Sequence, residues 1–164
     1  MHLPHQNVPT SVSPEGRLAI IGIGNSVAGD DGAGLEALRR LQERWRGDPQ
    51  LVFEALHGDL YSVSDLLPKA GHFLFLDAVC ASPAGQVVTC MERPGANAPS
   101  FHQTDIGAVM HTMERLQMAD PFPKWEIWGV TIEPPGELRV GLSTAVERGV
   151  DQLVESLDAR LRTR

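Results

Sequence analysis

The chain has 164 residues, of which 42% are hydrophobic and 21% charged, so it is long enough to bury one sizeable core. Its formal net charge of -7 at pH 7 argues against a nucleic-acid binder, because such proteins need clustered Lys and Arg against phosphates. No apolar run approaches the roughly 18 residues that a transmembrane helix needs. Two cysteines without a CxxC pair favour a reduced, cytoplasmic protein.

The N-terminal stretch, rich in proline and polar residues, lacks the charged-then-apolar order of a signal peptide. We expect residues 1–16 to form a mobile arm and residues 17–164 to form a single α/β domain. The first strand is predicted at residues 17–23, followed by a glycine-rich turn and a helix over residues 31–45. That helix has apolar residues at helical spacing, namely Leu35, Leu38, Leu41 and Trp45.

Further along the chain, residues 51–56 are predicted to form a strand, residues 60–67 a short helix, and residues 72–79 a strand buried on both faces. Residues 86–91 are predicted to form another strand. Only a short loop separates this strand from the preceding one, which is too few residues for a parallel crossover. We therefore expect it to be antiparallel and at an edge of the sheet.

The third helix is predicted to begin at a capping box formed by Ser100 and Gln103, and residues 125–132 form the next strand. The last helix is predicted to have its capping box at Thr144 and Glu147, with a buried apolar stripe of Val146, Val150, Leu153, Val154, Leu157 and Leu161. Alternating helices and strands predict a three-layer α/β sandwich with a mostly parallel sheet and one antiparallel edge strand, as in phosphorylase/hydrolase-like folds.

Ligands bind at the carboxyl ends of the strands in open α/β sheets. Asp30 and Asp31 follow the first strand, Asp77 ends the third, and His102 lies near the start of the third helix. Two carboxylates and an imidazole could hold a divalent ion with open coordination positions. The alternative is structural: one of the paired aspartates caps the first helix, Asp77 turns the chain, and His102 is a surface residue. His57 follows the second strand and is expected at the same edge.

Other chemistries have weaker support in the sequence. The segment GIGNSVAG begins like a dinucleotide fingerprint, but Val27 replaces the third glycine, and the two aspartates would repel a pyrophosphate. Ser26 has no GxSxG elbow around it. Cys80 could be activated by a histidine, but it is more simply a small buried thiol.

These residues resemble those of the hydrogenase maturation endopeptidases, which trim the large-subunit precursor of nickel–iron hydrogenases. The likeness covers about residues 18–161. It rests on GIGNSVAGDDGAG and, in the same order, on FLDAV (75–79), HQTDIG (102–107), WGVTIEP (128–134) and GLS (141–143). Many members carry an aspartate and paired glycines after the second strand, where this chain has EALHGD (54–59). This difference leaves open which hydrogenase is served and what His57 contributes.

The resemblance implies that Asp31, Asp77 and His102 are both the metal-contacting and the catalytic residues. The nickel is presented by the precursor, and other divalent cations could occupy the same place. The resemblance also implies an aspartyl-type or metal-dependent hydrolase that cuts off the precursor's C-terminal extension in the cytoplasm after nickel insertion.

The attacking water could be activated by the metal or by a carboxylate acting as general base. A monomer is expected, with residues 92–100 and 133–141 forming the rim that contacts the precursor. The first alternative is a nickel-binding maturation chaperone without catalysis. A nucleotide-binding protein ranks below it.

Overall fold

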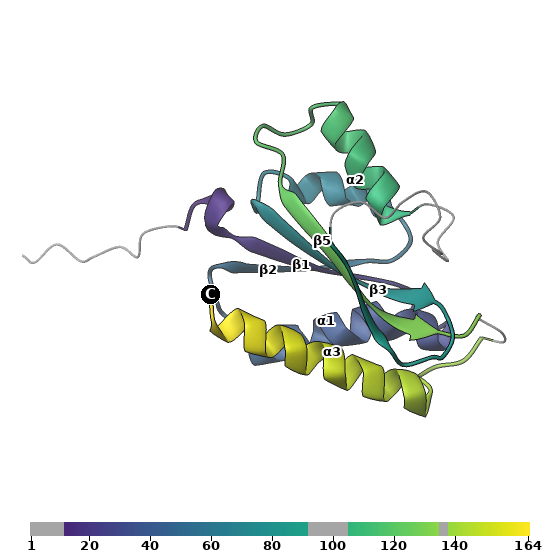
Figure 1. Ribbon diagram of the computed structural model, residues 1–164. Helices are drawn as coiled ribbons and strands as arrows, with labels where there is room; N and C mark the ends of the chain where they lie inside the picture. The colour runs from purple at the N-terminus through teal and green to yellow at the C-terminus, as the bar shows by residue number, and fades with distance from the viewer. Residues whose placement is uncertain (1–11, 92–104, 135–137) are drawn as a thin grey trace, which may run out of the picture.

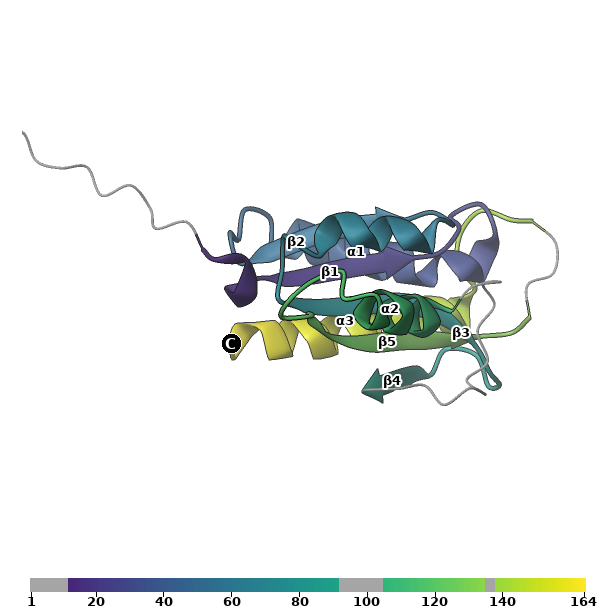
Figure 2. The same ribbon diagram turned by 90° about the horizontal axis from the view of Figure 1, so that it is seen from above.

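A five-stranded sheet forms the middle layer of the protein in the computed structural model, which describes residues 12–91, 105–134 and 138–164. The strands lie in the order β2-β1-β3-β5-β4, which can be followed from above in Figure 2. Four strands run parallel, and β4 runs antiparallel to β5 at the edge, as predicted. The bounds are β1 (Leu18–Ile23), β2 (Leu51–Leu56), β3 (His72–Cys80), β4 (Val87–Met91) and β5 (Lys124–Ile132).

Helices cover both faces of this sheet, and the predicted three-layer sandwich is confirmed (Figure 1). One face is covered by α1 (Ala33–Arg44) and α3 (Thr144–Arg162), the other by α2 (Ile106–Arg115) and the 3-10 helix η3 (Leu60–Leu66). Alternate residues of β1 belong to opposite cores: Ile20 packs under α1 and α3, and Ile21 packs under η3 and α2. Burial on both faces explains why β1 is apolar throughout.

Ion pairs join α1 to α3 along the outside of their contact. The guanidinium of Arg40 lies 2.7 Å from Glu36 on its own helix and 2.5 Å from Asp151 on α3, and it also contacts Glu147 of α3. Nearer the other end of the pair, the Asp158 carboxylate accepts a hydrogen bond from the Trp45 indole at 3.0 Å. The two helices are therefore held together along the second half of α1.

A buried carboxylate fixes α3 to β5. Glu126 of β5 is 3% exposed and lies 2.6 Å from the guanidinium of Arg160. It also accepts a hydrogen bond from the Trp128 indole at 3.2 Å and lies 3.5 Å from the His72 imidazole. Burial alone would raise the pKa of Glu126, but contacts with His72, Arg160 and Trp128 outweigh it and lower that pKa to about 2.

Three helix details differ from the sequence predictions. The cap of α3 is Ser143, one residue before the predicted Thr144, and Glu147 contacts Arg40 instead of completing a capping box. The cap of α2 is Asp105, whereas the predicted cap at Ser100 lies outside the described residues. The short helix after β2 has 3-10 geometry.

Backbone hydrogen bonds join the beginning of the described chain to the amino ends of β3 and β5. A short 3-10 turn, η1 (Pro14–Gly16), precedes β1. The Pro14 carbonyl accepts a hydrogen bond from the N–H of Gly71 at 2.8 Å, and Gly71 in turn accepts one from Lys124. Residues 12–16, part of the predicted arm, are thus in contact with the domain.

Candidate active site

The turn after β1 is built to present Asp31 at the carboxyl edge of the sheet. It contains a short 3-10 helix, η2 (Gly29–Gly32). The carbonyl of Asp31 accepts a hydrogen bond from the N–H of Asn25 at 3.3 Å, and the Asn25 side chain accepts one from Val27 at 3.1 Å. A Cβ on Gly24 would lie 2.2 Å from the Asp31 carbonyl oxygen, so the turn closes only around a glycine.

Gly34 brings the start of α1 directly against the ends of two strands. A Cβ at this position would lie 2.2 Å from the carbonyl oxygen of Leu76 in β3 and 2.5 Å from that of Ile23 in β1. Because Leu76 precedes Asp77 and Gly34 follows Asp31 by three residues, this contact brings the two acidic segments together. The close helix–strand packing therefore depends on Gly34, and Val27 lies in the exposed part of the turn.

Asp77 is a buried carboxyl group at the end of β3. It is 9% exposed and accepts a hydrogen bond from the N–H of Ala78 at 2.8 Å. Burial raises the pKa of Asp77 to about 8, the Ala78 N–H partly opposes this, and the carboxylates of Asp31 and Asp105 raise it further. Asp31 and Asp105 therefore each lie near enough to Asp77 to disfavour its charged form, and a cation beside Asp77 would relieve that repulsion.

Asp105 did not emerge from the sequence as a site residue. Its side chain accepts a hydrogen bond from the N–H of Gly107 at 2.9 Å and so caps α2. An aspartate directly before an apolar helix was the available signal, and it indicated a cap, not a neighbour of Asp77. His102, the third predicted ligand, lies outside the described residues. Within the described ranges no three His, Cys, Asp or Glu side chains form a metal-sized group, so the metal-contacting role stays a prediction.

The Asp30 side chain bonds to the segment before α3, not to the helix that directly follows it. The cap residue of α1 is Gly32, without a side-chain hydrogen bond, so Asp30 does not cap that helix. Its Oδ1 instead accepts a hydrogen bond from the N–H of Ser143 at 2.6 Å and one from Arg139 at 3.3 Å. The N–H of Gly29 donates to the Arg139 carbonyl at 2.7 Å. The turn after β1 is thus fastened to the segment that leads into α3.

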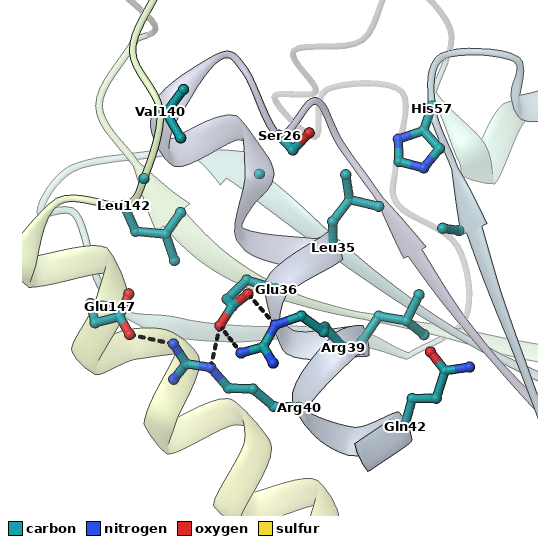
Figure 3. A pocket seen from close by; sticks show the side chains of 15 residues that line it. Ser26, Leu35, Glu36, Arg39, Arg40, Gln42, His57, Val140, Leu142 and Glu147 are labelled. Atoms are coloured by element: carbon teal, nitrogen blue, oxygen red, sulfur yellow. Dashed lines mark hydrogen bonds and ion pairs between the residues drawn. The ribbon is translucent and has the colours of Figure 1, made fainter. Parts of the chain in front are cut away.

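Two hollows flank this turn. One, of about 570 Å³, lies between the turn, the outer side of α1 and the end of β2; Figure 3 shows Ser26, His57, Leu35 and Val140 around it. His57 is exposed there, at the edge of the sheet where the sequence placed it. The second hollow, of about 630 Å³, is lined by Asp30 and Asp31 on one side and by residues between Ile132 and Ala145 on the other.

Exposed apolar side chains gather beside these hollows. Leu138 is 79% exposed, Val140 86% and Val27 55%. The backbone bond between Gly29 and Arg139 places the turn that carries Val27 beside the segment that carries the other two. These three exposed apolar side chains are named here the apolar rim.

The alternative chemistries gain no support from the structure. Burial and the Glu133 carboxylate raise the pKa of the Cys80 thiol, which is the opposite of what a cysteine nucleophile needs. The paired aspartates lie in η2, immediately before α1, where a pyrophosphate would have to bind. No helix in the ranges described has the length and apolar character required to cross a bilayer.

No family model matches the chain, and a search of curated proteins found no match. Solved structures do match over most of the chain. HybD, the hydrogenase maturating endopeptidase from E. coli, is 20% identical over 90% of this chain and 93% of its own, with a TM-score of 0.72. The NiFe hydrogenase maturation protease HybD from Thermococcus kodakarensis is 23% identical over 87% of this chain and 97% of its own, with a TM-score of 0.69.

A solution structure of an endopeptidase from Escherichia coli is 21% identical over 90% of this chain and 93% of its own, with a TM-score of 0.74. At these identities the likeness establishes the fold: the chain has the architecture of solved hydrogenase maturation proteases.

Proposed function

We propose that the protein belongs to the hydrogenase maturation endopeptidases and removes the C-terminal extension of a nickel–iron hydrogenase large-subunit precursor after nickel insertion. One observation carries this proposal. The contact of Gly34 with the ends of β1 and β3 brings the turn of Asp31 to the end of β3, where Asp77 lies. This arrangement occurs in a fold shared with solved maturation proteases.

The nickel belongs to the substrate, and the part of the enzyme that contacts it is the carboxyl edge of the sheet, where Asp31 and Asp77 lie. Asp31 and Asp77 would contact the nickel in the precursor, with His102 as the third ligand. Carboxylate oxygen and imidazole nitrogen suit a divalent ion of this kind. The contact would fix the scissile peptide over the turn after β1, and such positioning replaces much of the entropic barrier to hydrolysis.

Hydrolysis adds a water oxygen to the scissile carbonyl carbon, breaks the carbon–nitrogen bond and transfers a proton to the leaving amine. Two routes to the attacking water fit the site. In the first, nickel in the precursor, held by Asp31, Asp77 and His102, would lower the pKa of the water or polarise the carbonyl. In the second, Asp31 or Asp77 accepts the proton from the water as general base.

The precursor would dock on the apolar rim. Leu138 and Val140 lie in residues 133–141, one of the two segments predicted from sequence to contact the partner; the other, residues 92–100, lies outside the described residues. Exposed apolar side chains beside a cleft are typical of protein-binding surfaces. We place this reaction in the cytoplasm and expect a monomeric enzyme.

The test is cleavage of purified precursor, with and without nickel, followed by mass spectrometry. Wild-type protein should shorten only the nickel-loaded precursor. Asp31→Asn, Asp77→Asn and His102→Ala should each lower the rate at least 100-fold, because each removes a group that contacts the reacting centre. Asp65→Asn, which alters an exposed carboxylate of η3, is the matched control and should cut at the wild-type rate.

Three results would overturn the proposal or redirect it. Full activity in all three site variants would refute the assigned roles. Equal cutting of nickel-free precursor would remove the metal from the mechanism and leave the carboxylate route. Stoichiometric nickel binding by the free protein, with no change in precursor mass, would instead indicate a metallochaperone.

A further inference from the structure

Asp30 makes contacts that the proposed reaction does not itself require. Its carboxylate is 19% exposed and receives the N–H of Ser143 at 2.6 Å and the guanidinium of Arg139 at 3.3 Å. Ser143 is also the residue that caps α3 through its hydroxyl. The Asp30 carboxylate therefore lies at the positive end of the α3 dipole, 113 residues away in the sequence.

A second contact beside it joins the same two segments. The N–H of Gly29 donates to the carbonyl of Arg139 at 2.7 Å, and the Arg139 side chain covers the glycine so closely that a Cβ there would lie 2.9 Å from its Cγ. Gly29 has a φ of 60°, which favours glycine. We call this pair of contacts, Gly29–Arg139 and Asp30–Ser143, the strap.

The strap joins the two sides of the second hollow, the one lined by Asp30 and Asp31. One side is the turn that carries Asp31, and the other is the segment 138–143, which carries Leu138 and Val140. Further along the two helices, α1 is also joined to α3 by the ion pairs of Arg40 with Glu147 and Asp151. The strap therefore fixes the turn that carries Asp31 against the start of α3, in addition to the Gly34 contact that brings this turn to the end of β3.

We propose that Asp30 is a positioning residue for cleavage: by accepting the N–H of Ser143 it fixes the turn of Asp31 against the segment 138–143. This inference rests on the proposed function, and it assigns Asp30 no contact with the substrate. The oxygen acceptor matters more than the charge, because the shorter contact is to a neutral N–H and Arg139 is 54% exposed. The two aspartates of the DDG motif thus have different tasks.

The experiment compares Asp30→Ala with Asp30→Asn, since asparagine keeps the Oδ1 acceptor. Asp30→Ala should lower kcat on nickel-loaded precursor by about 10- to 100-fold, the loss typical of a displacement near 1 Å. Asp30→Asn should restore kcat to within about threefold of wild type. Amide hydrogen exchange at Gly29 and Ser143 should become faster in Asp30→Ala and stay slow in Asp30→Asn.

Asp158→Ala is the control for a purely structural effect. Asp158 is also a poorly exposed carboxylate, hydrogen-bonded to Trp45 and Arg162, and it lies near the last turn of α3. Its loss should lower the melting temperature at least as much as Asp30→Ala does. It should nevertheless leave kcat within about twofold of wild type at temperatures where the variant is folded.

The proposal fails if Asp30→Ala cuts as fast as wild type, if Asp30→Asn is as slow as Asp30→Ala, or if Asp158→Ala loses as much kcat. Failure of the proposed function has a different signature, because wild-type protein would then leave the loaded precursor intact. In that case, amide hydrogen exchange alone tests whether Asp30 holds the two segments together. Unchanged exchange at Gly29 and Ser143 in Asp30→Ala would show that the carboxylate holds neither segment.

Discussion

The contact of Gly34 with the ends of β1 and β3 can be tested by adding a single methyl group. In Gly34→Ala the new Cβ would meet the carbonyl oxygens of Leu76 at 2.2 Å and Ile23 at 2.5 Å. Both obstacles are backbone atoms of central strands, so they cannot rotate away as a flexible side chain would. The start of α1 must instead move outward by about 1 Å to reach ordinary contact distance.

The cost can be estimated from two opposing effects. Overpacking a well-packed site costs about 1–3 kcal/mol, and obstruction by backbone places this variant at the upper end. Alanine favours the helix over glycine by about 1 kcal/mol, which offsets part of the loss. The net loss is therefore about 2 kcal/mol, which for a domain of this size corresponds to a fall in melting temperature of about 4–8 °C.

The assay is thermal unfolding together with precursor cleavage, and Gly16→Ala is the matched control. A Cβ on Gly16 would meet its nearest neighbours at 3.6 and 3.9 Å, which is ordinary contact. Gly16→Ala should therefore be as stable as wild type or slightly more stable. Gly34→Ala should also lose cleavage activity while still folded, because the outward movement of α1 carries Asp31 away from Asp77.

A melting temperature for Gly34→Ala within 1 °C of wild type would refute this reasoning, since the clash would then be relieved at no cost. Wild-type cleavage by a destabilised Gly34→Ala would refute only its second half. The spacing of Asp31 and Asp77 would then not depend on this contact.

Two other predictions follow from features away from that contact. Because Glu126 has its pKa lowered to about 2 in the folded state from an ordinary value of 4.5, it stabilises the fold above pH 4.5, and about 3 kcal/mol should be lost as the pH falls from 5 to 2. In denaturant titrations Glu126→Gln should be less stable than wild type at pH 7 but should lose less stability on acidification; parallel pH curves would contradict this. The double variant Leu138→Ser/Val140→Ser should raise KM for the precursor at least threefold at unchanged melting temperature. Leu116→Ser, at another exposed apolar position, should leave KM unchanged.

The sequence predicted the architecture well because the relevant signals are local. The apolar runs of β1 and β3 have the composition of strands buried on both faces, and the apolar stripe of α3 has helical spacing. The short connection before β4 excluded a parallel crossover from β3, and β4 is indeed antiparallel at the edge. Each of these inferences uses only neighbouring residues and the geometry of one element.

The details that sequence missed depend on contacts between distant segments. Ser143 and Thr144 are chemically similar caps, and only the backbone path decides which one begins α3. The partners of Asp30 come from a segment more than 100 residues later, so its task could not be read from the turn itself. The sequence shows that residue 34 is a glycine. That no larger residue fits there depends on the positions of the Ile23 and Leu76 carbonyls, which only the structure gives.

Strand β2 has a consequence for how the protein behaves at high concentration. It pairs with β1 along one side and forms an edge of the sheet, and its sequence LVFEAL has the composition of segments that assemble edge to edge. Glu54 is the one charge in this stretch, and it is exposed. A second molecule that paired with this edge would bring two such carboxylates close together. Glu54 is therefore the residue whose charge would oppose self-association by strand addition at this edge.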